Sequence, residues 1–290
     1  MENFEEIFLT KIREADMVLI GLGEEFDRIN GSEDAAFAER EMMEQDLKWL
    51  IPAFRSYDAS KTTGVRREKM QQALENLAGL LVKKNYFILS VSQGKTISDT
   101  KWREGRLVMP CGCVCKKQCE HYCAEEDVIP LTEEEKTEIT RSFERFEVAS
   151  REVKDFLRGD VEQVPPEVRI AMKMIQRKEA VSGAVKGLEI DLRKILGKCE
   201  RCGADMVFNV IQAAKYNEKG YLKDWDHYAK WLYGSMSRNL VVIELGTAEN
   251  YPVLFKQGFE KITSLNPKAS HFVLGGENFE NVIDWLTKLC

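Results

Sequence analysis

Cysteines are concentrated in two segments of this chain. The segment 110–123 reads PCGCVCKKQCEHYC and holds five of the eight cysteines. Two more, Cys199 and Cys202, lie far downstream in the sequence KCERCG, and the eighth is the last residue, Cys290. A CxxCG turn lets two thiolates converge on one ion, and four such ligands complete a tetrahedral zinc site. The spacing therefore predicts a metal site that draws ligands from both segments.

The first segment offers more ligands than one zinc ion needs. We predict zinc bound by Cys115, Cys119, Cys199 and Cys202, with Cys111 beside Cys115 as an alternative pair and His121 as a further donor. Thiolate ligands do not by themselves distinguish zinc from iron, so an iron–sulfur cluster is a second interpretation. Free buried cysteines and a single activated Cys–His nucleophile explain the clustering less well, because an activated thiol needs no such density of neighbours.

Charge and terminal sequence limit the partners and the compartment. The net charge is −6 at pH 7, which argues against a general nucleic-acid surface, since phosphate binding needs an excess of Lys and Arg. The N-terminal residues are amphipathic and acidic, unlike a signal peptide, and no apolar run approaches the roughly 18 residues that span a bilayer. We therefore expect a cytoplasmic protein without a membrane or nucleic-acid partner, in which clustered thiols bind metal rather than form disulfides.

The elements around the cysteines predict an α/β fold. Apolar runs ending in glycine or serine, typical of buried parallel strands, occur at 17–23, 86–92 and 240–246. Amphipathic helices alternate with them, and Thr132 with Glu135 forms a capping-box sequence at the start of a long helical stretch. We expect a Rossmann-like parallel sheet formed by 1–105 and 206–290. A cysteine-rich zinc module with a helical insertion, 106–205, interrupts it.

Gly21-Leu22-Gly23 follows the first predicted strand. Glycines at such a turn let backbone amides approach a pyrophosphate. The next residues, Glu24 and Glu25, would repel a phosphate unless they point away, so a plain strand-to-helix turn is an equal interpretation of these residues.

Several stretches together resemble the sirtuins. KCERCGADMVFNV, 198–210, is similar to the sirtuin zinc turn, and LVVIELGTAENYPVLFKQGFEKITSLNP, 240–267, is similar to a stretch of bacterial sirtuin-like proteins, including the class linked to protein ADP-ribosylation. ADMVLIGLG and NYFILSVS stand where such proteins have their first nucleotide-binding turn and their catalytic strand. The resemblance covers 199–276 well and 1–123 weakly, and 124–198 is longer than the family's usual segment.

The resemblance implies a structural zinc, a bound NAD and ADP-ribose chemistry. Carried over residue by residue, it assigns cofactor binding to Gly21, Gly23, Ser92, Gln93, Gly246, Thr247 and Asn250. The reactive positions depart from the family pattern. Ser92-Gln93-Gly94 stands where the family has Asn-x-Asp, and KWREGRLVMPCG lacks the histidine expected before the zinc module. No catalytic residue can be assigned.

Three functions follow from these departures. The first is a sirtuin-like protein that binds NAD or ADP-ribose with reduced or absent NAD consumption, and it is the one we favour. The second is an active NAD-dependent deacylase or ADP-ribosyltransferase that uses a carboxylate such as Glu24 or Asp99 as its base. The third is an interaction module whose helical insertion binds a protein partner and whose sheet binds no nucleotide.

Overall fold

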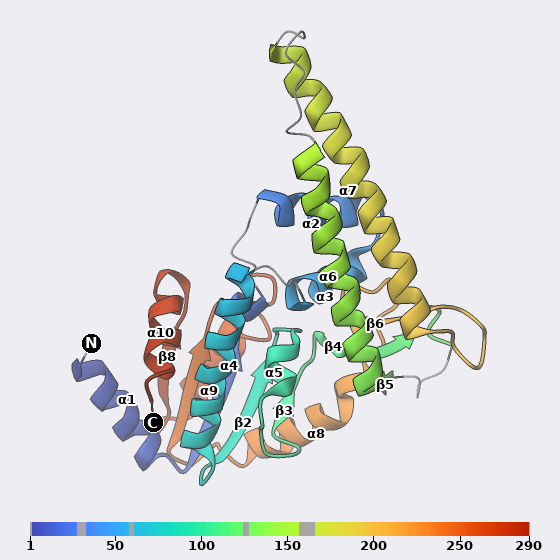
Figure 1. Ribbon diagram of the computed structural model, residues 1–290. Coiled ribbons are helices and arrows are strands. Elements are labelled where there is room, and N and C mark those ends of the chain that lie inside the picture. The colour runs from blue at the N-terminus through green and yellow to red at the C-terminus, as the bar shows by residue number, and fades with distance from the viewer. Residues whose placement is uncertain (1, 28–32, 58–60, 124–127, 157–165, 290) are drawn as a thin grey trace. The chain divides into compact units, whose positions relative to one another are not determined.

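The computed structural model describes all residues except 1, 28–32, 58–60, 124–127, 157–165 and 290 (Figure 1). The chain forms two compact units. The first consists of Met1–Arg28, Val65–Val114 and Asn217–Cys290, and the second of Ile29–Gly64 and Cys115–Tyr216. None of the described helices is both long and apolar enough to cross a lipid bilayer.

The first unit contains a parallel five-stranded sheet with the order β3-β2-β1-β7-β8. Its strands are β1 (Met17–Leu22), β2 (Asn85–Ser90), β3 (Leu107–Val108), β7 (Leu240–Leu245) and β8 (Ser270–Leu274). The chain runs outward from β1 to β3 and then returns to the other side of β1 to form β7. The neighbours β1 and β7 therefore flank the point where the strand order reverses, and ligands of open α/β sheets bind outside the carboxyl ends of the strands at such a point.

Both faces of this sheet are covered by helices, which explains the continuous apolar sequence of its strands. In β1, Val18 and Ile20 face a core shared with α1 (Glu2–Glu14), α4 (Lys61–Leu81) and α10 (Phe279–Leu286). Leu19 faces the opposite core, which contains side chains of α8 (Lys219–Tyr233) and α9 (Lys256–Leu265). Short elements complete the unit: η1 (Glu24–Asp27), α5 (Lys95–Asp99) and η3 (Gly276–Asn278).

The second unit combines a three-stranded sheet with helices. Its strands have the order β5-β4-β6, namely β5 (Val128–Pro130), β4 (Gly112–Cys119) and β6 (Met206–Val210). Its helices are α2 (Glu33–Glu44), η2 (Lys48–Leu50), α3 (Ile51–Tyr57), α6 (Glu133–Phe156) and α7 (Pro166–Leu196). The two long helices α6 and α7 run side by side (Figure 1).

The capping box forms as the sequence predicts. The backbone N–H of Thr132 donates to Glu135 Oε2 at 2.8 Å, and the N–H of Glu135 donates to Thr132 Oγ1 at 3.1 Å. These reciprocal bonds satisfy donors at the start of α6 that have no partner within the helix.

The boundaries of the units differ from those expected. The described part of 29–64 belongs with the cysteine-rich unit, because α2 packs on α7 and Tyr57 stacks on Phe143 of α6 with ring centroids 5.6 Å apart. The strand β6 joins the small sheet, although the sequence analysis placed 206–216 with the large one. Conversely, β3 lies at the edge of the large sheet, inside the stretch assigned to the zinc module.

Candidate functional site

Four cysteines of the second unit lie together. The Sγ atoms of Cys119, Cys123, Cys199 and Cys202 all lie within 4.8 Å of one another. Two of these separations are 3.6 Å, between Cys119 and Cys202, and 3.3 Å, between Cys123 and Cys199. A tetrahedral ion with zinc–sulfur bonds of about 2.3 Å places its sulfurs about 3.8 Å apart. The donor set and its spacing therefore fit one tetrahedral zinc ion and leave little room for a cluster of several iron atoms.

Local backbone geometry brings each pair of cysteines to the site. Cys119 ends β4, and the following turn passes through Tyr122, a non-glycine residue with φ of 54°, before Cys123. In the second pair, Gly203 has φ of 72°, and its N–H donates to the carbonyl of Cys199 at 2.9 Å. Such a conformation favours glycine, which explains the glycine of the CxxCG sequence.

The metal-ligand prediction needs one correction, because Cys123 stands in the cluster where Cys115 was expected. Cys115 lies within β4, and a strand rises about 3.3 Å per residue, so four residues separate Cys115 from Cys119 by about 13 Å. Both cannot bind one ion. The C-x3-C spacing brings two thiols together only where the chain turns, as it does after Cys119.

The other candidates of the first segment also lie outside the cluster. Cys111 and Cys113 belong to the first unit, where Cys113 Sγ lies 2.9 Å from Ser98 Oγ. His121 is exposed and is not among the clustered donors. Cys290 falls outside the described residues.

Backbone amides next to Cys199 favour its thiolate. Hydrogen bonds from the amides of Cys202 and Arg201 lower the pKa of the Cys199 thiol from 9.0 to about 7. Metal binding needs the thiolate form. The amides of the CxxCG turn therefore favour the metal-binding form of Cys199 near neutral pH.

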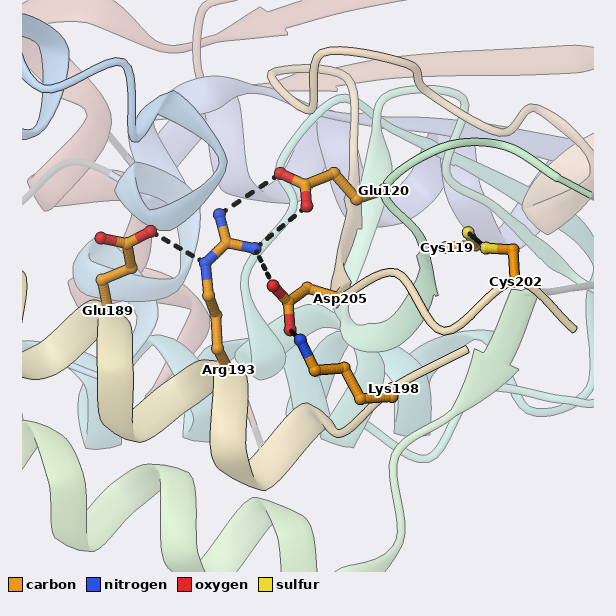
Figure 2. Close-up of polar contacts among 7 residues, drawn as sticks. All are labelled: Cys119, Glu120, Glu189, Arg193, Lys198, Cys202 and Asp205. Atoms are coloured by element: carbon orange, nitrogen blue, oxygen red, sulfur yellow. Dashed lines mark hydrogen bonds and ion pairs between the residues drawn. The ribbon is translucent and has the colours of Figure 1, made fainter. Parts of the chain in front are cut away.

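An arginine of α7 connects the two cysteine segments, as Figure 2 shows. Arg193 Nη1 lies 3.1 Å from Glu120 Oε2 and 3.3 Å from Asp205 Oδ2, while its Nε donates to Glu189 at 2.8 Å. Glu120 directly follows Cys119, and Asp205, which also pairs with Lys198, closes the knuckle. The guanidinium therefore holds both chain segments that supply thiolates.

The predicted nucleotide residues gather at the carboxyl ends of β1, β2 and β7, but Gly21 has a packing role. Gly21 lies within β1, and a Cβ there would come within 2.2 Å of Phe259 and 2.7 Å of Phe255. A Cβ at Gly23 would come within 2.3 Å of the Thr247 carbonyl oxygen. Both glycines are thus explained by the close approach of neighbouring elements, without a bound phosphate.

The chain's own carboxylates occupy the polar groups at this end of the sheet. Glu25 Oε2 accepts from the N–H of Thr247 at 2.9 Å and from that of Gly276 at 3.2 Å. Glu24 accepts from the backbone and side-chain nitrogens of Asn250 at 3.0 and 2.6 Å. Repulsion between these carboxylates and a phosphate was expected from the residue types, but their hydrogen bonds to the amides were not predicted.

Asp27 occupies the groups at the end of β2. It accepts from Ser92 Oγ at 2.7 Å, from the N–H of Gln93 at 2.7 Å and from the N–H of Gly94 at 3.0 Å. The side chain of Gln93 is buried and donates to the carbonyl of Cys111 at 2.6 Å. The two residues predicted to contact a cofactor here are therefore bound within the protein.

The thiol of Cys111, a residue whose carbonyl accepts from Gln93, is unsuited to nucleophilic attack. Burial raises the pKa of Cys111 to about 12, against a hydrogen bond from Tyr251 that lowers it. A thiol with this pKa remains protonated at neutral pH, and the thiolate is the reactive form. Cys111 is therefore not an activated nucleophile.

Comparisons with known proteins give matches among solved structures. No protein-family model and no curated protein matches the chain. A structure titled Sir2Tm bound to a propionylated peptide is 11% identical, with a TM-score of 0.45, and the match covers 98% of this chain and 96% of that chain. A Sir2–p53 peptide–NAD+ structure is 11% identical with a TM-score of 0.46, at 97% and 95% coverage. A mutant Sir2 homologue in complex with ADP-ribose is 13% identical with a TM-score of 0.44, at 98% and 95% coverage.

Proposed function

We propose that this chain is a sirtuin-like protein with a structural zinc and a sheet of the NAD- or ADP-ribose-binding type, and that it does not consume NAD. The sequence resemblance, the parallel sheet with its reversal between β1 and β7, and the four clustered thiols support the first part. The loss of reactive side chains supports the second.

The observation that carries the proposal is the position of Asp27. Its carboxylate binds Ser92, Gln93 and Gly94, the residues that stand where the resemblance expects Asn-x-Asp. In the sirtuins that the sequence resembles, the Asn and Asp side chains of that motif position the ribose and the amide of nicotinamide. Here the same stretch directs its donors to a residue of the protein, so it has little capacity to orient a substrate.

In this proposal, Cys119, Cys123, Cys199 and Cys202 hold the zinc. When bound, the ion would supply no reactive group, because all four positions are protein ligands, and a catalytic zinc keeps one position open. Its role would be to fasten segments 83 positions apart in the chain, as measured between Cys119 and Cys202. A protein with four reduced thiols fits a reducing compartment, so we place it in the cytoplasm.

A partner-binding role for the α6–α7 hairpin is the second candidate. The side chains of Met174 and Ile175 on α7 are 66% and 59% exposed. These two neighbouring apolar side chains are the surface that we assign to a protein partner. This role is compatible with the absence of NAD consumption.

The test is nicotinamide release by the purified zinc-loaded protein. We expect no release above the protein-free background when NAD is offered with acetylated or propionylated peptides, or with a protein acceptor for ADP-ribose. An active sirtuin serves as the positive control. Steady release that disappears in the variant Asp27→Ala would overturn the proposal and favour the active deacylase or ADP-ribosyltransferase.

A further inference from the structure

Two backbone amides at the ends of β7 and β8 converge on one point. The N–H groups of Thr247 and Gly276 both donate to a single oxygen, Glu25 Oε2. Gly246 and Gly276 have φ of 80° and 67°, and a Cβ at Gly275 would come within 2.7 Å of the Gly246 carbonyl carbon. The glycines therefore let two strand ends approach until both amides point at one anionic oxygen.

This oxygen belongs to Glu25 of η1, a short segment that contacts with α4 and α10 hold in place. Glu25 is only 4% exposed. Its carbonyl accepts from Arg66 Nη2 at 3.1 Å, while Arg66 Nε pairs with Glu280 at 2.7 Å. The ring of Phe26 packs edge-on against Phe279 with centroids 5.1 Å apart. Contacts with α4 and α10 therefore hold η1 so that Glu25 accepts from the two amides.

A neighbouring hydroxyl lacks a partner in this arrangement. Among the described residues, the buried Oγ1 of Thr247 has no hydrogen-bond partner. Buried hydroxyls are normally bonded. The internal carboxylate thus satisfies the Thr247 amide and leaves the Thr247 hydroxyl without a bond.

We infer that Glu25 is a tethered acidic ligand that keeps an oxyanion site closed, and that a phosphate group of a nucleotide binds there only when Glu25 has left. The inference deepens the proposed function, on which it rests, by assigning a regulatory contact to the same end of the sheet. A carboxylate and a phosphate cannot share these amides, because both are negative and each needs the same two donors. Removal of Glu25 is therefore expected to create binding.

The experiment compares the full-length, zinc-loaded wild type with Glu25→Ala, using inorganic pyrophosphate as the probe. Titration is followed by amide NMR, which reports on Thr247 and Gly276 directly. We expect both amide signals to shift in Glu25→Ala and pyrophosphate to bind at least tenfold more tightly than in the wild type. The matched control is Glu277→Ala, which removes an exposed carboxylate next to Gly276 and should leave the wild-type affinity unchanged.

A second variant guards against misfolding. Glu25→Gln keeps the size of the side chain and removes its charge, so we expect a gain smaller than that of Glu25→Ala and larger than that of Glu277→Ala. If Glu25→Ala fails to fold by circular dichroism, Glu25→Gln decides the question. Equal affinity in wild type and Glu25 variants, or an equal gain in Glu277→Ala, would overturn the inference.

The two proposals fail in distinguishable ways. Nicotinamide release by the wild type would contradict the proposed function, whatever pyrophosphate does. The other outcome is that pyrophosphate does not shift the amide signals of Thr247 and Gly276 in the folded Glu25 variants, while the wild type releases no nicotinamide. That result would contradict only the tethered-ligand inference.

Discussion

The cysteine cluster and the strand ends after β1 and β7 both bring together groups that lie far apart in the sequence, but the groups differ in kind. In each, groups from distant segments converge on one point. At the cysteines, four like ligand atoms meet within 4.8 Å, and their thiolates would repel one another without a cation. At the strand ends, backbone N–H donors meet carboxylate acceptors of the same chain: Thr247 donates to Glu25, and Gln93 donates to Asp27. The two regions therefore differ in kind: like ligand atoms converge at the cysteines, whereas complementary donors and acceptors pair at the strand ends.

The largest expected effect comes from breaking the cysteine cluster. Cys202→Ser should lose the bound metal and destabilise the protein by about 5 kcal/mol or more, since structural zinc contributes about 10–16 kcal/mol of apparent binding free energy. Elemental analysis and thermal unfolding measure both. Cys115→Ser is the control, because Cys115 lies outside the cluster, and it should keep its metal. Loss of metal in the control with retention in Cys202→Ser would refute the ligand set.

A smaller effect is expected from removing the Asp27 carboxylate, which accepts hydrogen bonds at the end of β2. Asp27→Ala should destabilise the protein by about 3 kcal/mol, because the amides of Gln93 and Gly94 lose their acceptor and each buried unpaired donor costs about 1–3 kcal/mol. Asp27→Asn should cost less, since the amide oxygen still accepts. Denaturant unfolding measures both, with the exposed Asp226→Ala as control. If Asp27→Ala is as stable as this control, Asp27 does not hold the end of β2.

The smallest of the three effects separates packing from ligand binding. Gly21→Ala should cost about 2 kcal/mol through overpacking against Phe259 and Phe255. Gly79→Ala in α4, where a Cβ meets nothing within 4 Å, should stabilise the protein by about 0.5–1 kcal/mol. Thermal unfolding of the pair tests the packing role of Gly21. A neutral Gly21→Ala would instead return Gly21 to the set of candidate phosphate-binding residues.

Elements with a local cause were predictable from the residues alone. Continuous apolar runs predicted the buried parallel strands, and Thr132 with Glu135 predicted the start of α6. The CxxCG sequence predicted a turn that brings two thiols together, and Gly203 has the positive φ of that turn. Each depends on neighbours within a few residues, so the pattern is readable without the fold. The difference between Ser92-Gln93-Gly94 and the Asn-x-Asp motif of the sirtuins that the sequence resembles was readable in the same way.

Which groups meet depends on long-range packing and could not be predicted from local patterns. It replaced Cys115 with Cys123, because the course of β4 and the turn after Cys119 set which thiols can converge. It also placed Glu25 on amides 222 and 251 positions away. Such pairings depend on how strand ends are juxtaposed in space, and no local periodicity encodes that juxtaposition. Residue types therefore predicted a metal site and a glycine-rich turn, whereas long-range packing determines which four thiols converge and which carboxylates accept from the strand-end amides.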